Sequence, residues 1–394
     1  MKKIKIVIGA VFSVVLSCAI LFVPVVFLWL IAAFDGMNLH FLVPVIGIAL
    51  VSVICLIVMG FMQKKLYKKT IVALSVFILM LSFSVIAEYL YKDKFIPSIT
   101  VGQQNAVYMQ YMPFTHSENL SHLDGEPLLH FSKEDNLPVI DGATALFPVY
   151  CSFAEAVYPS DCKIENYVNF STTDEAFKRL VAGDDDIIFV AQPSKEQLAS
   201  ANDAGVEFVL HPIGYEAFVF LVNKKNPVDS LTVQQIKDIY TGAITNWKEV
   251  GGKNKVIRPF QRNVNSGSQT AFIALMGKDA ELLPPETHQV QTMMGLVDVV
   301  SDYQNHSNAI GYSFRYYVEN MKRNIGVKIL KLNGIEPTRE NIRTQAYPVT
   351  GNFYAITVKG RESENTKKLI DWVQSRQGQE LIEKVGYVSL ENEG

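Results

Sequence analysis

Three long apolar segments without a charged side chain occupy the first ninety residues of this 394-residue chain. They cover residues 6–34, 41–62 and 71–87. A helix needs about 20 apolar residues to cross the hydrocarbon core of a bilayer, and about 17 is the lower limit. The third segment lengthens when it is extended to 70–90, where Glu88 and Tyr89 are typical of an interfacial boundary. We therefore expect three transmembrane helices, at about 6–34, 41–62 and 70–90.

The lysines of this region predict its orientation in the membrane. Residues 1–90 hold seven lysines, no arginine and two acidic residues, a net charge of +5, and the lysines lie before the first segment and between the second and third. Positively charged loops remain in the cytoplasm, so we expect a multi-pass cell-membrane protein with a cytoplasmic amino terminus. Everything after residue 91 should then be extracytoplasmic. That remainder carries a net charge of −8, which argues against nucleic acid as a partner.

Two other interpretations of the first apolar segment are weaker. A cleaved signal peptide has an apolar core of about 7–15 residues, and this segment is longer and is followed by further apolar segments. Cys18 follows a sequence faintly similar to a lipoprotein cleavage site, but it lies in the middle of an apolar run, so a buried cysteine explains it better. We interpret residues 1–91 as an anchor, or as a packing surface for a partner membrane protein.

Residues 92–137 are polar and irregular, and we expect them to form a juxtamembrane linker. Three histidines are scattered through this stretch, at His116, His122 and His130. Their spacing matches no zinc-binding pattern, so no metal site is predicted.

From residue 138 to 394 short apolar strands alternate with amphipathic helices, which predicts an α/β domain. We expect helices at about 145–158, 174–181 and 233–240, and buried strands at 186–191 and 218–222. This alternation favours parallel-type sheets with helices on both faces.

Segments 213–220 and 347–356 bracket a central block of the outer domain and look related in role. The chain is therefore expected to leave one lobe and return to it, with lobe I at about 138–212 and 347–394 and lobe II at about 213–346. Such a two-lobed clamp would hold its ligand between the lobes.

Cys151 and Cys162 would face an oxidising environment if the predicted topology is correct. Their separation permits a disulfide. A buried free thiol at Cys151 fits its apolar surroundings equally well, so both alternatives remain open.

The most informative motif is a loop of small polar residues between a predicted strand and a predicted helix. Arg262 would supply a planar, permanently charged group suited to an oxyanion. Ser266 and Ser268 offer hydroxyl groups, and Gly267 lets the main chain approach a ligand. The helix, expected to begin at Gln269 or Thr270, adds free N–H groups and the positive end of its dipole. An ordinary capped helix beside a surface arginine would look the same in isolation.

Two further strand-to-helix junctions repeat this chemistry. The first runs from Gly142 to Ala145 and includes Thr144, and the second runs from Phe170 to Asp174 and includes Ser171. Each alone is explained by helix capping. Three such helix starts on both lobes favour convergence on one small anion.

Several segments together are similar to the phosphate-binding proteins of ABC-type phosphate importers, in the type II periplasmic-binding-protein superfamily. The resemblance covers about 138–390. It rests on Ala143-Thr144 with Pro148-Val149-Tyr150, on 231–247, on Arg262 with Ser266-Gly267-Ser268, and on Ala309-Ile310-Gly311-Tyr312.

The resemblance implies which residues contact the anion. From lobe I it implies Thr144, the main-chain N–H of Ala145, and Ser171. From lobe II it implies Arg262, Ser266, Gly267 and Ser268. Where the family places an aspartate that accepts the proton of phosphate, this chain has Ala191-Gln192-Pro193, so Gln192 is a further candidate contact. A glutamine would not repel a fully ionised anion as a carboxylate does.

The leading hypothesis is therefore a membrane-anchored extracytoplasmic binding protein that captures inorganic phosphate or a similar oxyanion for an ABC importer. Its expected partners are the anion, the membrane subunits of the importer and the lipid bilayer. The alternative is an oxyanion sensor that acts through a partner protein. The sequence contains no phosphate-binding Gly-x4-Gly-Lys-Ser/Thr loop, no Gly-x-Ser-x-Gly elbow and no zinc-spaced His/Cys set. We therefore expect neither an enzyme nor a cofactor.

Overall fold

The computed structural model describes residues 110–390, apart from 116, 278, 285–307 and 322–325. All of the described residues belong to one compact unit, residues 96–394. The three expected transmembrane helices and the first part of the expected linker lie outside the described residues. Within the described ranges, no helix combines the length and apolar character needed to cross a membrane.

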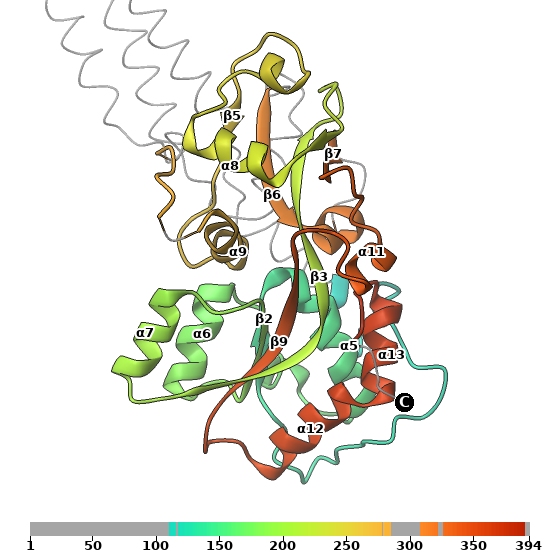
Figure 1. Cartoon of the computed structure of the whole chain (residues 1–394). Coiled ribbons are helices and arrows are strands. Elements are labelled where there is room, and N and C mark those ends of the chain that lie inside the picture. The colour runs from blue at the N-terminus through green and yellow to red at the C-terminus, as the bar shows by residue number, and fades with distance from the viewer. Residues whose placement is uncertain (1–109, 116, 278, 285–307, 322–325, 391–394) are drawn as a thin grey trace, which may run out of the picture. The chain divides into compact units, whose positions relative to one another are not determined.

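The unit is a two-lobed α/β domain (Figure 1). Lobe I begins with its first strand and helices and is completed by the carboxyl-terminal elements. Its elements are β1 (Ile140–Gly142), η2 (Thr144–Leu146), α5 (Phe147–Val157), η3 (Ile164–Asn166), α6 (Thr173–Ala182), β2 (Ile187–Val190), α7 (Lys195–Asp203), β9 (Thr350–Val358), α12 (Glu364–Gln374) and α13 (Arg376–Val385).

Lobe II is formed by the central part of the chain. Its elements are β4 (Ser230–Leu231), α8 (Val233–Thr241), η4 (Trp247–Val250), β5 (Arg258–Pro259), α9 (Gly267–Met276), β6 (Ala309–Phe314), the π-helical turn η5 (Tyr317–Met321), β7 (Val327–Ile329), β8 (Lys331–Leu332) and α11 (Arg339–Arg343).

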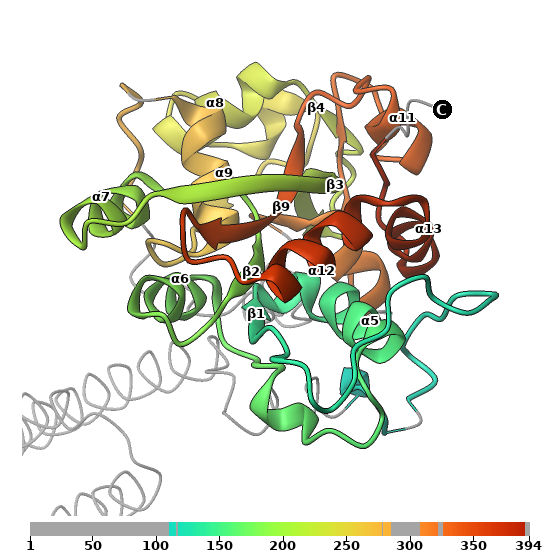
Figure 2. The ribbon, with the colours of Figure 1, turned by 90° about the horizontal axis from the view of Figure 1, so that it is seen from below.

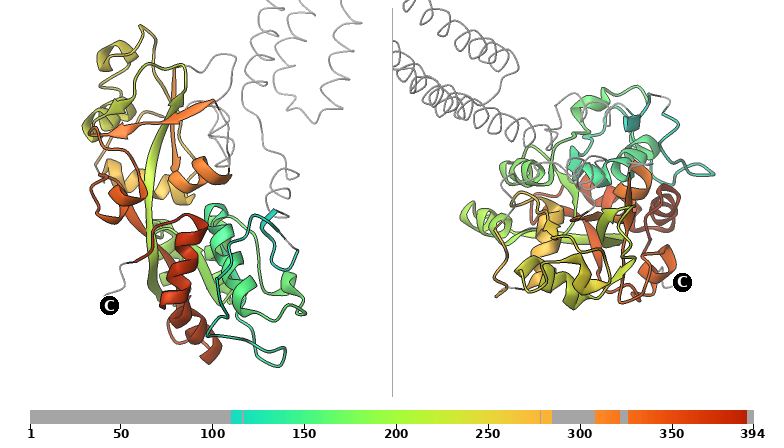
Figure 3. Two further views of the ribbon diagram at one scale, coloured as in Figure 1. Left: turned by 90° about the vertical axis from the view of Figure 1, so that its right-hand side faces the viewer. Right: turned by 90° about the horizontal axis from the view of Figure 1, so that it is seen from above.

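The 16-residue strand β3 (Phe208–Asn223) belongs to both lobes. Its first part pairs antiparallel with β9 in lobe I, and its last part pairs antiparallel with β6 and β7 in lobe II. Figure 3 shows this long strand running from one lobe into the other. The strand order is β1-β2-β9-β3-β6-β5, with β1–β2 and β5–β6 parallel. The expected parallel sheets are therefore mixed, because β9 pairs antiparallel with β2 and β3, and β3 pairs antiparallel with β6 and β7.

The core of lobe I follows from strand alternation in β2, whose four residues are all buried. Ile188 and Val190 pack with Phe177 and Leu180 of α6, whereas Ile187 and Phe189 pack on the opposite face with α5, α12 and α13. Successive side chains of a strand point to opposite faces, so helices cover both sides of this sheet (Figure 2). The helices and strands predicted at 145–158, 174–181, 186–191, 218–222 and 233–240 all have counterparts in these elements.

The described part of the expected linker, from residue 110 onward, does not form a free spacer. Tyr111, Met112, Leu120 and Phe131 are buried in the core of lobe I. The Phe131 amide donates to the carbonyl of Val157 at the end of α5, at 2.9 Å. The sequence did not predict this burial, because the apolar residues of the segment follow no helical or strand period.

Candidate functional site

A cavity of about 860 Å³ is lined by both lobes and by the strands that connect them. Its wall includes most of the predicted contact residues: Thr144, Ala145, Gln192, Arg262, Ser266, Gly267 and Ser268. The helices η2, α6, α7 and α9 begin in this wall. The N-terminal residues of a helix leave N–H groups without intrahelical partners and carry the positive end of the helix dipole, so the cavity favours an anion.

In lobe II the site is built on the first turn of α9. The helix begins at Gly267, two or three residues before the expected start at Gln269 or Thr270, because Ser266 serves as its N-cap and accepts a hydrogen bond from the Gln269 main-chain amide at 3.2 Å. This role uses an acceptor position of the Ser266 hydroxyl and leaves its proton for another acceptor. Gly267 and Ser268 therefore lie within the first helical turn, where main-chain N–H groups are free to bind a ligand.

The Ser268 hydroxyl is the most direct indication of a ligand. Its side chain is fully buried and lines the cavity, yet its oxygen has no hydrogen-bond partner among the described residues. A buried hydroxyl without a partner is unfavourable. A bound anion would provide the acceptor that the protein does not.

Arg262 supplies the positive charge of the site. Its side chain is only 6% exposed, and this burial lowers the pKa of the guanidinium to about 10, so it remains a cation at neutral pH. Its amide donates to Gln269 Oε1 at 3.1 Å and to the Tyr312 hydroxyl at 3.0 Å. A buried cation gains much of its stability from a counter-charge, and an anion in the cavity would provide one.

A glutamine and a tyrosine hold this loop against the helix. The Tyr312 hydroxyl of β6 donates to Gln269 Oε1, and the Tyr312 ring stacks on Phe272 of α9 with centroids 4.6 Å apart. Gln269 Nε2 donates to Gln261 Oε1 at 3.4 Å. The start of α9 and the residues around Arg262 are thus joined through buried side chains before any ligand binds.

In lobe I the site is built from main chain rather than from side chains. The turn at the end of β1 packs closely on β2, since an ideal Cβ at Gly142 would lie 2.3 Å from the Phe189 carbonyl oxygen. Only glycine fits there. Thr144 and Ala145 begin η2, whose preceding residue Ala143 makes no side-chain cap. The Tyr387 hydroxyl donates to the Ala145 carbonyl and ties this turn to the chain after α13.

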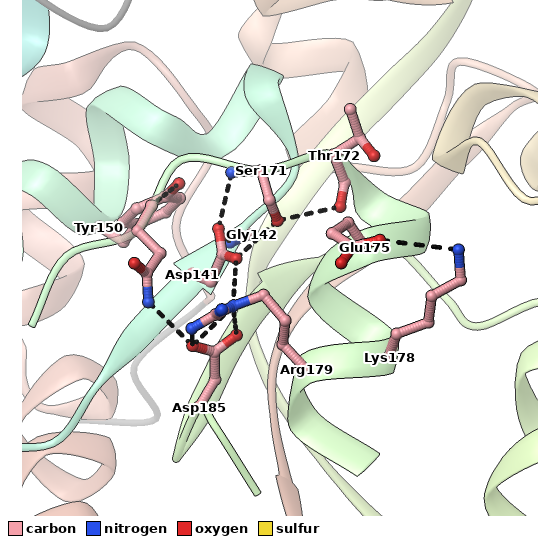
Figure 4. A network of polar contacts seen from close by, with 10 residues as sticks. Asp141, Gly142, Tyr150, Ser171, Thr172, Glu175, Lys178, Arg179 and Asp185 are labelled. Atoms are coloured by element: carbon pink, nitrogen blue, oxygen red, sulfur yellow. Dashed lines mark hydrogen bonds and ion pairs between the residues drawn. The ribbon is translucent and has the colours of Figure 1, made fainter. Parts of the chain in front are cut away.

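Ser171 is held behind the cavity wall rather than on it. Its hydroxyl donates to Asp141 Oδ2 at 2.5 Å and its amide donates to Asp141 Oδ1 at 3.0 Å (Figure 4). Thr172 and Thr173 line the cavity in its place. The predicted contact residue Ser171 is therefore not among the lining residues of the cavity, and its hydroxyl is bonded to the Asp141 carboxylate at the end of β1.

Asp141 is the support of the lobe I half. It is fully buried and accepts hydrogen bonds from Ser171 and from the Gly142 amide at 2.7 Å, while Arg179 Nε lies 3.6 Å from Oδ2. Arg179 is held in turn by Asp185, with Nη2 2.8 Å from Oδ1 (Figure 4). Burial raises the pKa of the Asp141 carboxyl to about 6, although the hydrogen bonds from Ser171 oppose this rise.

Glu216 is a charged residue of the cavity wall that is not among the predicted contact residues, and Arg315 is its charged partner. Glu216 lies in β3, lines the cavity and is only 6% exposed. Its Oε1 lies 3.5 Å from Arg315 Nε, and it accepts hydrogen bonds from the amides of Ala217 at 2.8 Å and Tyr316 at 3.2 Å. Burial raises its pKa to about 7 against the opposing effect of Arg315. A charged residue inside an otherwise apolar strand was the available sequence signal.

The remaining predicted residues are Gln192, Cys151 and Cys162. Gln192 follows β2 and lines the cavity, but its side chain is exposed. Cys151 is buried in α5 and Cys162 is partly buried in the turn before η3, and both are free thiols. The disulfide that their spacing permits is therefore not formed, and Cys151 packs as an apolar side chain of the lobe I core.

A family model described as a PBP superfamily domain matches residues 133–377, which is more than half of the chain. The chain belongs to the PBP superfamily.

Among curated relatives of this PBP-superfamily chain, Protein SphX of Synechococcus elongatus is 24% identical over 67% of this chain and 80% of its own length. The Phosphate-binding protein PstS of Staphylococcus aureus is 28% identical over 63% of this chain and 77% of its own length.

Among solved structures, a putative phosphate ABC transporter substrate-binding protein of Clostridium perfringens, with bound phosphate, is 29% identical at a TM-score of 0.53. The match covers 65% of this chain and 100% of that one.

Proposed function

We propose that the two-lobed domain captures inorganic phosphate, or a similar tetrahedral oxyanion, and delivers it to an ABC-type importer. The named relatives support this proposal, because they include phosphate-binding proteins and a substrate-binding protein with bound phosphate. The cavity supports it independently through a buried cation, hydroxyl groups and helix N-termini on both lobes.

The observation that carries the proposal is the Ser268 hydroxyl beside the Arg262 loop. This hydroxyl is fully buried, lines the cavity and has no acceptor among the described residues. Phosphate oxygens are strong acceptors that a charged guanidinium, a serine hydroxyl and helical N–H groups bind together. The overall negative charge of the outer domain does not prevent such binding, since these donors act on the anion at short range.

Calorimetric titration of the full chain in detergent micelles with phosphate, sulfate and molybdate tests this function. We expect saturable heat with phosphate. Loss of that heat in Arg262→Met, with its retention in Arg258→Met, would place the anion at the cavity, because Arg258 of β5 does not line it. The absence of heat with all three anions from a folded protein would refute the oxyanion function. Equal affinity for phosphate and sulfate would favour a general oxyanion receptor.

We propose further that residues 1–91 anchor this domain in the cell membrane by three helices, with the amino terminus in the cytoplasm. The lysine distribution and the three apolar segments support this topology. Reporter fusions after residue 67 and after residue 94 test it, using alkaline phosphatase, which is active only outside the cytoplasm. We expect activity from the second fusion alone. Activity from the first fusion would contradict the proposed orientation.

A further inference from the structure

The anion-binding loop of lobe II also touches lobe I directly, through Asn265. Asn265 Oδ1 accepts a hydrogen bond from the Ser194 hydroxyl at 2.9 Å, and the Asn265 carbonyl accepts one from Gln197 Nε2 at 3.2 Å. Ser194 and Gln197 lie at the N-terminus of α7 in lobe I. The same residue thus belongs to the loop between Arg262 and Ser268 and to a contact between the lobes.

Ser194 and Gln197 are prearranged for this contact by the capping box of α7. The main-chain N–H of Gln197 donates to Ser194 Oγ at 3.1 Å, and the main-chain N–H of Ser194 donates to Gln197 Oε1 at 2.8 Å. After this reciprocal cap is made, the Ser194 proton and the Gln197 Nε2 group are still available as donors. Asn265 accepts from both. Ser194 and Gln197 are 6% and 5% exposed, so the two donors are largely shielded from water.

Asn265 has a backbone conformation suited to presenting both of its oxygens to lobe I. Its φ is +64°, a left-handed conformation that asparagine tolerates better than most residues. The start of α9 also lies close to lobe I, since an ideal Cβ at Gly267 would be 3.4 Å from Thr173 Oγ1 and 3.9 Å from Ala191 Cβ. The two lobes therefore meet along one edge of the cavity, next to the Arg262 loop.

We propose that docking of Asn265 into the α7 capping box is the closure contact of this clamp, and that it sets the rate at which the bound anion leaves. Asn265 is a positioning residue: it holds the Arg262–Ser268 loop against lobe I and does not itself bind the anion. Breaking the contact should speed dissociation and leave association nearly unchanged, because ligand enters before the lobes close. The proposal rests on the proposed anion-binding function only for its kinetic readout.

Two variants each remove one of the two hydrogen bonds of the contact without removing a predicted anion ligand. Asn265→Gly deletes the side-chain acceptor and keeps the left-handed backbone accessible. Gln197→Glu keeps the Oε1 acceptor of the capping box and deletes the Nε2 donor to Asn265. The chain offers a matched control for each. Asn333→Gly changes another asparagine with positive φ, 52°, which binds the Val233 amide. Gln235→Glu alters the equivalent Thr232–Gln235 capping box of α8. Neither control residue lines the cavity.

The first measurement is the dissociation of radiolabelled inorganic phosphate from the full chain after an excess of unlabelled phosphate is added. We expect each contact variant to dissociate about tenfold faster, the size of effect that hydrogen bonds of this kind produce. The association rate should change by less than about twofold, and both controls should match the wild type. Unchanged dissociation in both contact variants, or an equal acceleration in the controls, would overturn the proposal.

The second measurement is amide hydrogen exchange of the ligand-free chain, which does not require phosphate to bind. Asn265→Gly should increase exchange in the first turn of α7, residues 195–198, and Asn333→Gly should not. If the wild type binds no phosphate, the proposed function fails but this result still decides the contact between the lobes. Unchanged exchange at α7 in Asn265→Gly would then refute it.

Discussion

The two halves of the proposed anion site present different groups to the cavity. Lobe II presents one continuous loop, from Arg262 to Ser268, whose charged and hydroxyl side chains are buried and face the cavity. Lobe I presents the turn at Thr144 and Ala145 and the start of α6, and its buried charge, Asp141, lies behind the wall and holds Ser171. We therefore expect lobe II to supply most of the binding free energy, and lobe I to complete the enclosure with main-chain N–H groups.

The largest effect should come from removing the charge of lobe II. Arg262→Met is expected to weaken phosphate binding about 100- to 1000-fold, since loss of one partner of a buried charge pair typically costs about 2–5 kcal/mol. Arg262→Lys should lose less, because it keeps the charge but not the planar donor geometry. Calorimetric titration measures both. A loss of less than tenfold in Arg262→Met would show that lobe II does not dominate.

The Asp141 carboxyl of lobe I should affect the stability of the domain rather than its affinity for phosphate. The pKa of Asp141 is raised by burial from 3.8 to about 6, so the folded state binds its proton more tightly than the unfolded state. Stability from this group is therefore complete below about pH 4 and declines as the pH rises to about 6, by about 3 kcal/mol. Asp141→Asn should remove this decline in urea unfolding followed by near-ultraviolet circular dichroism.

Two further variants test whether this pH dependence comes from Asp141. Glu216→Gln should remove a separate decline that extends to about pH 7, since burial raises the pKa of Glu216 to about 7. Asp161→Asn, in an exposed pair with Lys133, should leave stability almost unchanged, because exposed ion pairs contribute little. If Asp141→Asn leaves the pH dependence of the wild type intact, the Asp141 carboxyl does not titrate as described.

Removal of the Ser268 hydroxyl should reveal a smaller side-chain contribution of lobe II to phosphate binding. Ser268→Ala should weaken phosphate binding about tenfold, because one charge-assisted hydrogen bond is lost. Ser313→Ala is the matched control, since Ser313 of β6 is also fully buried with a hydroxyl that has no partner among the described residues, but it does not line the cavity. Equal losses in the two variants would attribute the effect to packing.

The smallest effect is expected from the Thr144 hydroxyl of lobe I. Thr144→Val should weaken binding by only about threefold, because the main-chain N–H groups of the turn are unchanged. Thr144→Ser keeps the hydroxyl and should bind like the wild type. Titration of these variants beside Ser268→Ala compares the lobes directly. A larger loss in Thr144→Val than in Ser268→Ala would reverse the comparison.

Much of this arrangement could be predicted from the sequence because the signals are local. Apolar period and capping residues predicted the helices, and the hydroxyl-rich loop after a strand predicted the lobe II site. The start of α9 was placed too late because glycine is a poor helix former, whereas Ser266 caps the helix before it.

The rest depends on contacts between distant segments. Ser171 is turned toward Asp141, 30 residues earlier, and Asn265 meets Ser194, 71 residues earlier. No periodicity or spacing records such pairings. The burial of Tyr111 and Phe131 was missed for the same reason, since their partners lie in helices far along the chain. The three transmembrane helices remain a prediction.

The continuity of β3 has a consequence for how this domain folds. One strand is hydrogen-bonded in both lobes, to β9 along its first part and to β6 and β7 farther along. Neither lobe can lose that strand without exposing the core of the other. The lobes should therefore unfold in a single cooperative transition, even though the proposed closure moves one lobe relative to the other.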